Sequence, residues 1–234
     1  MFFDSTYILV LIGAGICALA QWNVNRTFSE YSKVRTEAGI TGAQAARRFL
    51  SSEDLGSMPV NHVAGTLTDH YDPTSKSVSL SDMVYGSTSV AAIGVAAHEC
   101  GHALQDKEGY MPLAIRSAIL PVANIGSKAA WYLILIGLVL TSVAEKVGSI
   151  ALQAGVVCFM AVVAFQLVTL PVEFNASRRG LELLSREGML TSEEESQAGK
   201  VLFAAALTYV AGAVSSALQL LRLILIANRG RSRR

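Results

Sequence analysis

The sequence predicts a multi-span α-helical membrane protein with a small α+β unit between its first and second spans. Apolar residues make up 52% of the 234-residue chain and charged residues only 16%, a balance more apolar than that of a soluble globular domain. Four apolar stretches have membrane-spanning length, and one long polar segment separates the first from the other three. These three observations together define the fold class.

The four apolar stretches are expected to be transmembrane helices, the fourth of them transmembrane or membrane-associated. Only "EKVG" separates the second stretch from the third, which predicts a tight helical hairpin that crosses the bilayer twice. The N-terminal stretch lacks a positively charged start and a small-residue cleavage site, so we expect it to be retained as an anchor. The four expected spans are residues 7–22, 118–144, 149–172 and 201–227, and a basic tail covers residues 228–234.

The polar segment, residues 23–117, is expected to form the α+β unit. Thr41 is a suitable N-cap for a short amphipathic helix through Leu50. The following "VNHVAGTLTDHYDPTSKSVSLSDMVY" alternates apolar and polar residues around a turn, which predicts a β-hairpin or a three-stranded unit. The alanine-rich "STSVAAIGVAAHECGHALQ" predicts a helix that ends near Gln105. A further helical segment, residues 173–200, is expected between the third and fourth spans.

Charge and cysteine usage exclude two classes. The formal net charge is +1 and the positive residues are scattered except at the C-terminus, so no basic stripe for nucleic acid exists. The three cysteines occur singly and without CxxC spacing, which excludes a disulfide framework and a cysteine metal site.

The strongest motif is H-E-x-x-H, formed by His98, Glu99 and His102. Histidines four positions apart on a helix project from one face and can bind the same Zn²⁺, while the glutamate can take a proton from a metal-activated water. The alternative is two polar residues on one helix face. Because the surrounding helix is apolar, an unliganded histidine pair there would be costly. The motif therefore predicts a zinc site with Glu99 as catalytic base.

A hydrolytic zinc needs a third protein ligand. The residues after the motif exclude the three-histidine metzincin pattern, which leaves His62, His70 and a downstream carboxylate. Two membrane crossings return the chain to the face of the motif at Glu173, which we favour. His70 is the rival ligand, or else a residue beside the site that contacts substrate, and Glu173 could instead pair with Arg178 or Arg179 at the membrane edge.

The segments "TDHYDPTSKSVSLSDMVYGSTSVAAIGVAAHECGHALQ", "LPVEFNASRRGLELL" and "LTYVAGAVSSALQLLRLI" resemble the YugP-like neutral zinc metallopeptidases of bacterial membranes, over nearly the whole chain. The resemblance implies a zincin-like catalytic unit of the glutamate type with one Zn²⁺ per chain. It implies that His98, His102 and Glu173 are the zinc ligands and that Glu99 is the catalytic base.

One position departs from the wider group of glutamate-type zincins. In those relatives an aspartate four residues after the ligand glutamate commonly orients a ligand histidine, whereas this chain has Ser177 there. Three residues are therefore candidates for the side chain that hydrogen-bonds to a zinc ligand and orients it. They are Asn175, Ser177 and Arg178.

The function expected from motif and resemblance is zinc-dependent endopeptidase activity in the bacterial plasma membrane, on polypeptide substrates that include membrane proteins. The flanking positive residues favour a cytoplasmic catalytic face, although the C-terminal arginines argue for the opposite orientation. The alternative is a membrane scaffold with a structural zinc, which would need a fourth ligand such as His70 or Asp72. A zinc transporter is disfavoured because the third span has no charged residue.

Overall fold

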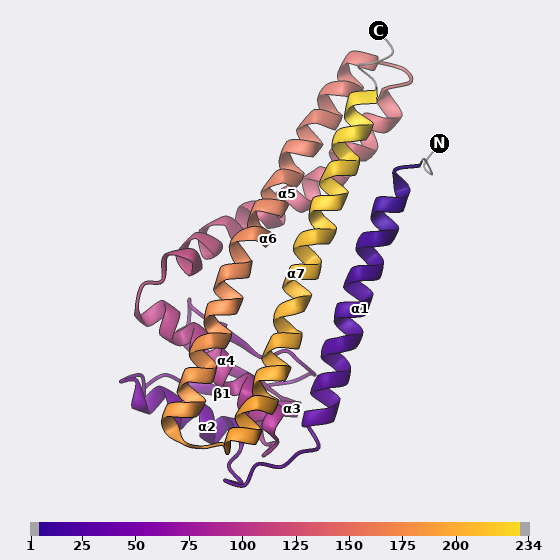
Figure 1. The fold of residues 1–234 in the computed structure, drawn as a ribbon. Coiled ribbons are helices and arrows are strands. Elements are labelled where there is room, and N and C mark those ends of the chain that lie inside the picture. The colour runs from indigo at the N-terminus through magenta and orange to yellow at the C-terminus, as the bar shows by residue number, and fades with distance from the viewer. Residues whose placement is uncertain (1–4, 230–234) are drawn as a thin grey trace. The chain divides into compact units, whose positions relative to one another are not determined.

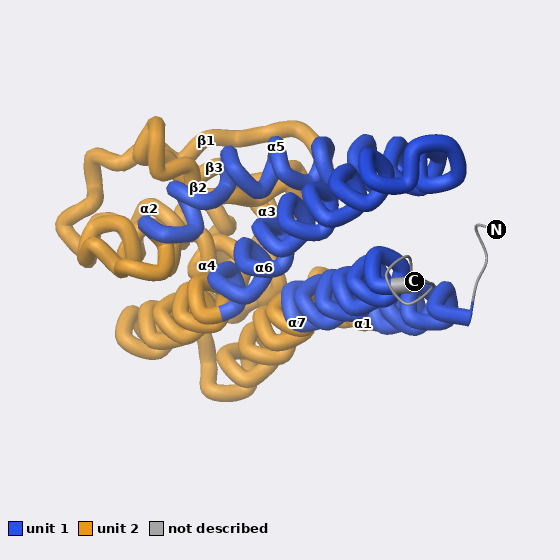
Figure 2. Tube along the Cα trace, turned by 90° about the horizontal axis from the view of Figure 1, so that it is seen from above, with its two compact units in different colours: residues 1–19, 114–170, 209–234 blue, residues 20–113, 171–208 orange. Residues whose placement is uncertain are grey.

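The computed structural model describes residues 5–229, so residues 1–4, which precede the expected first span, and residues 230–234 of the expected basic tail lie outside it. Most described residues are helical (Figure 1). The chain forms two compact units (Figure 2). The first unit comprises residues 1–19, 114–170 and 209–234, and the second unit comprises residues 20–113 and 171–208.

Four described helices are long and apolar enough to cross a membrane, as the multi-span prediction requires. Each contains most or all of one expected span and continues beyond it on at least one side. The four helices are α1 (Tyr7–Tyr31), α5 (Met111–Leu140), α6 (Glu145–Glu187) and α7 (Ser192–Arg229).

The first unit has a small core and a largely apolar surface. Its core is a cluster of buried side chains that includes Ile134 and Leu152. Large apolar side chains point outward around it: Ile125 is 71% exposed, Trp131 63% and Ile150 68%. So much exposed apolar surface is unfavourable in water and is typical of helices surrounded by lipid.

The connection between α5 and α6 lies four residues earlier in the chain than expected. Residues 141–144 make the connection, and "EKVG" forms the first turn of α6 instead. Glu145 is favourable there because a carboxylate complements the positive end of the helix dipole. Gly137 and Gly148 let the two chain segments approach closely, since a side chain at either would collide with the neighbouring segment.

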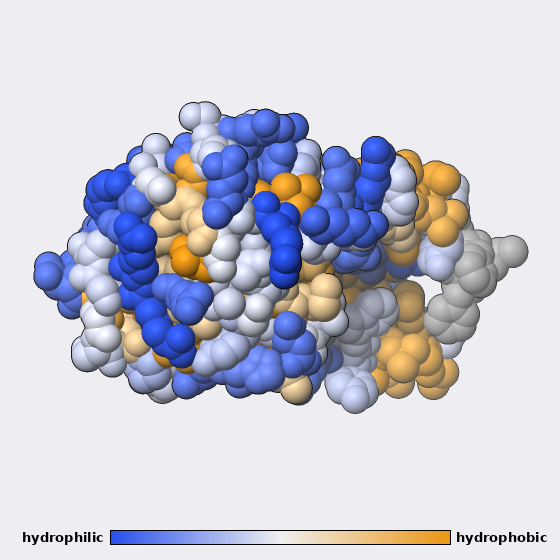
Figure 3. Space-filling model, turned by 90° about the horizontal axis from the view of Figure 1, so that it is seen from below, coloured by the Kyte–Doolittle hydropathy of each residue, from blue (hydrophilic) through white to orange (hydrophobic). Residues whose placement is uncertain are grey.

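The second unit contains the α+β fold. Figure 3 shows one face of the molecule, on which hydrophilic residues predominate. The sheet of the second unit has three strands in the order β1-β3-β2, with β1 parallel and β2 antiparallel to β3. This confirms the three-stranded form of the prediction. The unit's shorter elements are α2 (Gly42–Ser52), β1 (Val60–Val63), β2 (His70–Asp72), β3 (Ser77–Ser81), α3 (Asp82–Tyr85) and α4 (Val90–Lys107).

Local capping explains where α2 and α4 begin. Thr41 forms a complete capping box with Gln44, as its residue type predicts. The Ser89 side chain accepts a hydrogen bond from the backbone N–H of Ala92 at the start of α4. Most of α4 is buried, and it packs against α2, α3 and the sheet (Figure 1). The H-E-x-x-H residues are therefore held on a rigid, central helix.

Candidate metal centre

Helix α4 and the part of α6 that belongs to the second unit bring three potential metal ligands together. His98 and His102 project from α4, and Glu173 projects from α6. The Nε2 atom of His98 lies 3.3 Å from Oε2 of Glu173, and Nε2 of His102 lies 3.6 Å from the same oxygen. Among the described residues, these three form a group whose donor atoms all lie within 4.8 Å of one another.

These separations fit a tetrahedral zinc site. Ligand atoms about 2.0–2.2 Å from a tetrahedral zinc lie about 3.3–3.6 Å from one another. A direct ion pair would be tighter, since a charged N–H···O bond is typically about 2.7–2.9 Å long. Two imidazole nitrogens and a carboxylate oxygen are also a donor set that zinc prefers. The three residues therefore fit a zinc ion.

Burial strengthens this assignment of the site. Glu173 is only 1% exposed and His102 only 7%. A carboxylate at that depth has to be compensated by positive charge and hydrogen bonds. The two histidine rings meet edge to face with their centroids 4.7 Å apart, so that both direct Nε2 toward Glu173.

Gln105 determines which ring nitrogen of His102 carries the proton. The Gln105 amide group donates to the carbonyl oxygen of Val172 at 2.8 Å and to Oδ1 of Asn175 at 2.9 Å. Its Oε1 therefore faces Nδ1 of His102, 3.0 Å away, and accepts a hydrogen bond from it. With the proton on Nδ1, Nε2 of His102 keeps its lone pair for a metal.

Ser177 takes the corresponding place beside His98. Its hydroxyl lies 3.1 Å from Nδ1 of His98, so it can accept a hydrogen bond from that N–H and leave the lone pair of Nε2 for a metal. Ser177 follows Glu173 by four residues, one helical turn along α6. A neutral hydroxyl thus stands where the wider relatives carry aspartate, and it orients the ring without adding a negative charge.

Further hydrogen bonds hold Asn175 in place. Its Oδ1 accepts a hydrogen bond from Nε of Arg179 at 2.7 Å, in addition to the one from Gln105. Arg179 also binds Glu108 through two parallel contacts of 2.7 Å each, and these contacts hold the pKa of Glu108 below its usual range. The chain of hydrogen bonds runs from the surface through Asn175 and Gln105 to His102.

Glu99 lies on α4 in a buried position, 7% exposed. Burial raises its pKa, and the adjacent His98 and His102 offset this only in part. A carboxylate with a raised pKa is a stronger base than one in water, as a general base working near neutral pH requires.

Several residues considered from the sequence lie elsewhere. His70 is exposed on β2 with Nδ1 against the carbonyl of Thr68, 2.9 Å away, and His62 binds Asp82. Arg178, one of the three candidates for the hydrogen-bond partner of a ligand, pairs with Glu182. Among the described residues, none of these three joins the ligand group. Arg179, the other residue considered as a partner of Glu173, pairs with Glu108 at 2.7 Å.

Gln105 is the site residue that sequence reasoning missed. It appeared there only as the end of a helix. A signal was present, because Gln105 follows His102 by three positions and so shares its helix face. A fully buried glutamine on that face needs partners for both its donors and its acceptor.

Two glycines allow α4 and α6 to approach closely enough to form the site. A side chain at Gly101, inside the motif, would collide with the backbone carbonyl of Ala176. A Cβ at Gly180 would lie 2.9 Å from the carbonyl carbon of Ala97. Backbone contact at both points places Glu173 and Ser177 beside the histidines.

Gly101→Ala is therefore expected to force the two helices apart. Overpacking of this kind costs about 1–3 kcal/mol, and the shift should also lower zinc occupancy. Thermal unfolding in detergent and metal analysis of the purified protein measure both effects. Gly199→Ala is the matched control, because its Cβ would meet only Leu181 methyl carbons at 3.8 and 4.0 Å. Normal zinc content and stability in Gly101→Ala would contradict the close-crossing explanation.

The chain is similar to known proteins over nearly its whole length. A family model described as "Putative neutral zinc metallopeptidase" matches residues 6–228. The chain is 47% identical over 223 residues to the "Putative membrane protease YugP" of Bacillus subtilis (strain 168), covering 95% of this chain and 96% of that protein. No solved structure matches the chain. The chain belongs to the neutral zinc metallopeptidase family.

Proposed function

We propose that this protein is an integral membrane endopeptidase that uses one zinc ion per chain to hydrolyse peptide bonds. The observation that carries the proposal is the group of His98, His102 and Glu173, of which His102 and Glu173 are buried, with the buried Glu99 beside it on α4. The family relationship supports the same reaction class. In this proposal the catalytic unit, zincin-like and of the glutamate type, is built from residues 23–117 and 173–200.

The number of ligands favours catalysis over a structural metal site. A closed structural zinc site has four protein ligands, whereas a catalytic one has three and an open position. Among the described residues, the group holds only His98, His102 and Glu173, and neither His70 nor Asp72 supplies a fourth. Asp72 instead accepts hydrogen bonds from Thr74 and Ser75 in the turn after β2.

The chain's own residues then have distinct roles. A bound zinc would supply Lewis acidity, which polarises a carbonyl and acidifies a water molecule. The Glu99 carboxylate accepts the proton of the attacking water and delivers it to the nitrogen of the leaving amine. Gln105 and Ser177 keep the two ligand histidines in the required tautomer. An extended substrate adds to an edge strand of the sheet, β1 or β2, where main-chain hydrogen bonds would align it.

The proposed location is the bacterial plasma membrane. Four helices with the length and hydropathy of spans and the relative named as a membrane protease support it. The positive residues that flank the expected spans favour a cytoplasmic catalytic face. In this setting, the substrates are polypeptides that include membrane proteins.

Metal removal is the direct test of the proposed reaction. The protein purified in detergent should contain one zinc per chain by elemental analysis and should cleave casein or a peptide library. Chelation should abolish cleavage, and added zinc should restore it. Cleavage that persists after complete metal removal would refute zinc catalysis. Tightly held zinc without cleavage of any peptide would favour the structural scaffold.

A further inference from the structure

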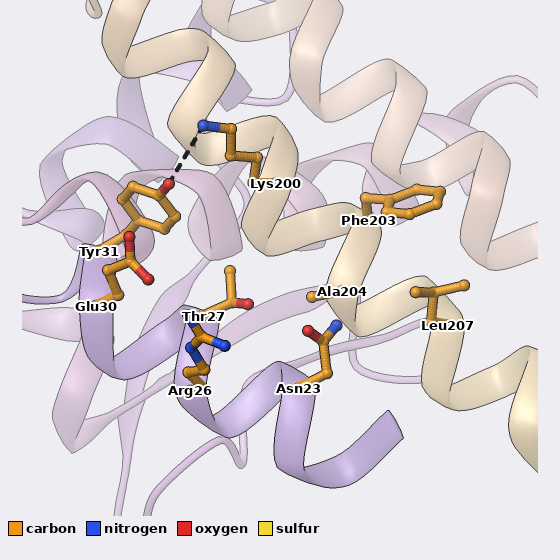
Figure 4. Close-up of a pocket in the computed structure, with 9 residues that line it drawn as sticks. All are labelled: Asn23, Arg26, Thr27, Glu30, Tyr31, Lys200, Phe203, Ala204 and Leu207. Atoms are coloured by element: carbon orange, nitrogen blue, oxygen red, sulfur yellow. Dashed lines mark hydrogen bonds between the residues drawn. The ribbon is translucent and has the colours of Figure 1, made fainter. Parts of the chain in front are cut away.

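A separate cavity of about 450 Å³ lies in the second unit between the C-terminal end of α1 and the first part of α7 (Figure 4). Its lining residues come from these two helices only, whereas the candidate zinc ligands come from α4 and α6. The cavity is therefore distinct from the candidate metal centre.

Two positive side chains line this cavity from opposite helices. Arg26 belongs to α1 and Lys200 to α7. The Lys200 ammonium donates to the hydroxyl of Tyr31 at 3.4 Å, a long contact, and the Arg26 guanidinium lies 5.5 Å from the centre of the Trp22 ring. No carboxylate in the described part of the chain lies within 4.0 Å of either charged group. Glu30 also lines the cavity, so the lining carries two positive charges and one negative charge.

The cavity is polar at one end and apolar toward the other. Asn23 and Thr27 add hydrogen-bonding groups on the α1 side. On α7, Phe203 and Leu207 follow Lys200 toward the apolar part of the helix, and Phe203 is 61% exposed. Such a lining suits a ligand with an anionic head and an apolar tail.

The position of the cavity along both helices corresponds to the depth of lipid headgroups. Arg26 follows the apolar stretch 7–22 by four residues, about one helical turn. Lys200 directly precedes the apolar stretch 201–227. Trp22, 59% exposed, lies at the same boundary, where tryptophan is enriched at membrane interfaces. Basic pockets between membrane helices at this level bind anionic headgroups.

We propose that this cavity binds the headgroup of an anionic phospholipid. The phosphate would lie between Arg26 and Lys200, with Asn23 and Thr27 donating further hydrogen bonds. An acyl chain would follow Phe203 and Leu207. The inference depends on the membrane placement of α1 and α7 in the proposed function and is independent of the peptidase reaction.

Lipid titration of the full chain in a neutral detergent, followed by native mass spectrometry, tests the proposal. Dioleoylphosphatidylglycerol should bind more tightly than dioleoylphosphatidylcholine. Arg26→Gln/Lys200→Gln should weaken phosphatidylglycerol binding about 30-fold, because each basic residue near the membrane surface strengthens binding roughly 5-fold. The matched control is Lys33→Gln/Arg35→Gln, which removes the same charge from exposed neighbours outside the cavity and should retain binding.

Three results would overturn the lipid site. They are equal binding of both lipids, equal losses in the two double variants, and displacement of the lipid by inorganic phosphate at a similar concentration, which would identify a phosphate site. Arg26→Lys/Lys200→Arg, which keeps both charges, should retain binding if loss of charge rather than misfolding explains the effect. Failure of the protein to insert into membranes would instead contradict the proposed function.

Discussion

Glu99→Gln is expected to lower kcat/KM for peptide hydrolysis by about 100- to 10,000-fold, the range typical of a lost general base, while the protein keeps its zinc. Glutamine has nearly the same size as glutamate, so the buried position next to His98 and His102 should remain filled. It has no carboxylate to take a proton from the attacking water. A fluorogenic peptide assay with parallel metal analysis separates the loss of the base from the loss of the metal.

Glu182→Gln provides the matched control for this loss. Glu182 is an exposed glutamate on α6 that pairs with Arg178. Its replacement should leave activity within about twofold, as for surface substitutions generally. Wild-type cleavage by Glu99→Gln would show that this glutamate is not the base. Loss of zinc from the variant would mean that the substitution disturbs the metal centre instead.

Glu173→Ala is expected to weaken zinc binding by more than about 100-fold, since even partners of ligand residues contribute about 10- to 100-fold. The substitution removes the carboxylate of the ligand group and leaves the half-buried His98 and the buried His102 without a third ligand. Competition against a chromogenic chelator measures the affinity. Cleavage should fall in proportion to zinc occupancy.

His70→Ala distinguishes the two candidate third ligands. His70 is exposed and its Nδ1 contacts the Thr68 carbonyl, so its replacement should leave zinc affinity unchanged. Zinc loss in His70→Ala together with normal affinity in Glu173→Ala would transfer the third ligand to His70. Reduced affinity in both variants would indicate that the loop before β2 contributes to the site.

The elements defined by near neighbours in the chain could be predicted well. The capping box at Thr41, the helix carrying His98 and His102, and the four long apolar helices all follow from periodicity and residue type within a few turns. The connection before α6 lies four residues earlier than predicted. The apolar pattern does not distinguish a connection of four residues from the first turn of a helix.

By itself, the sequence determined a pair of imidazoles on one helix face with a glutamate beside them, because a spacing of four is converted directly into one helical turn. Only the tertiary structure decided which distant residues complete that pair. Glu173 meets the histidines because glycines at 101 and 180 let two helix backbones touch. The same crossing brings Ser177 to His98 and gives Gln105 its partners. These contacts depend on packing between segments about 70 residues apart, which no local pattern encodes.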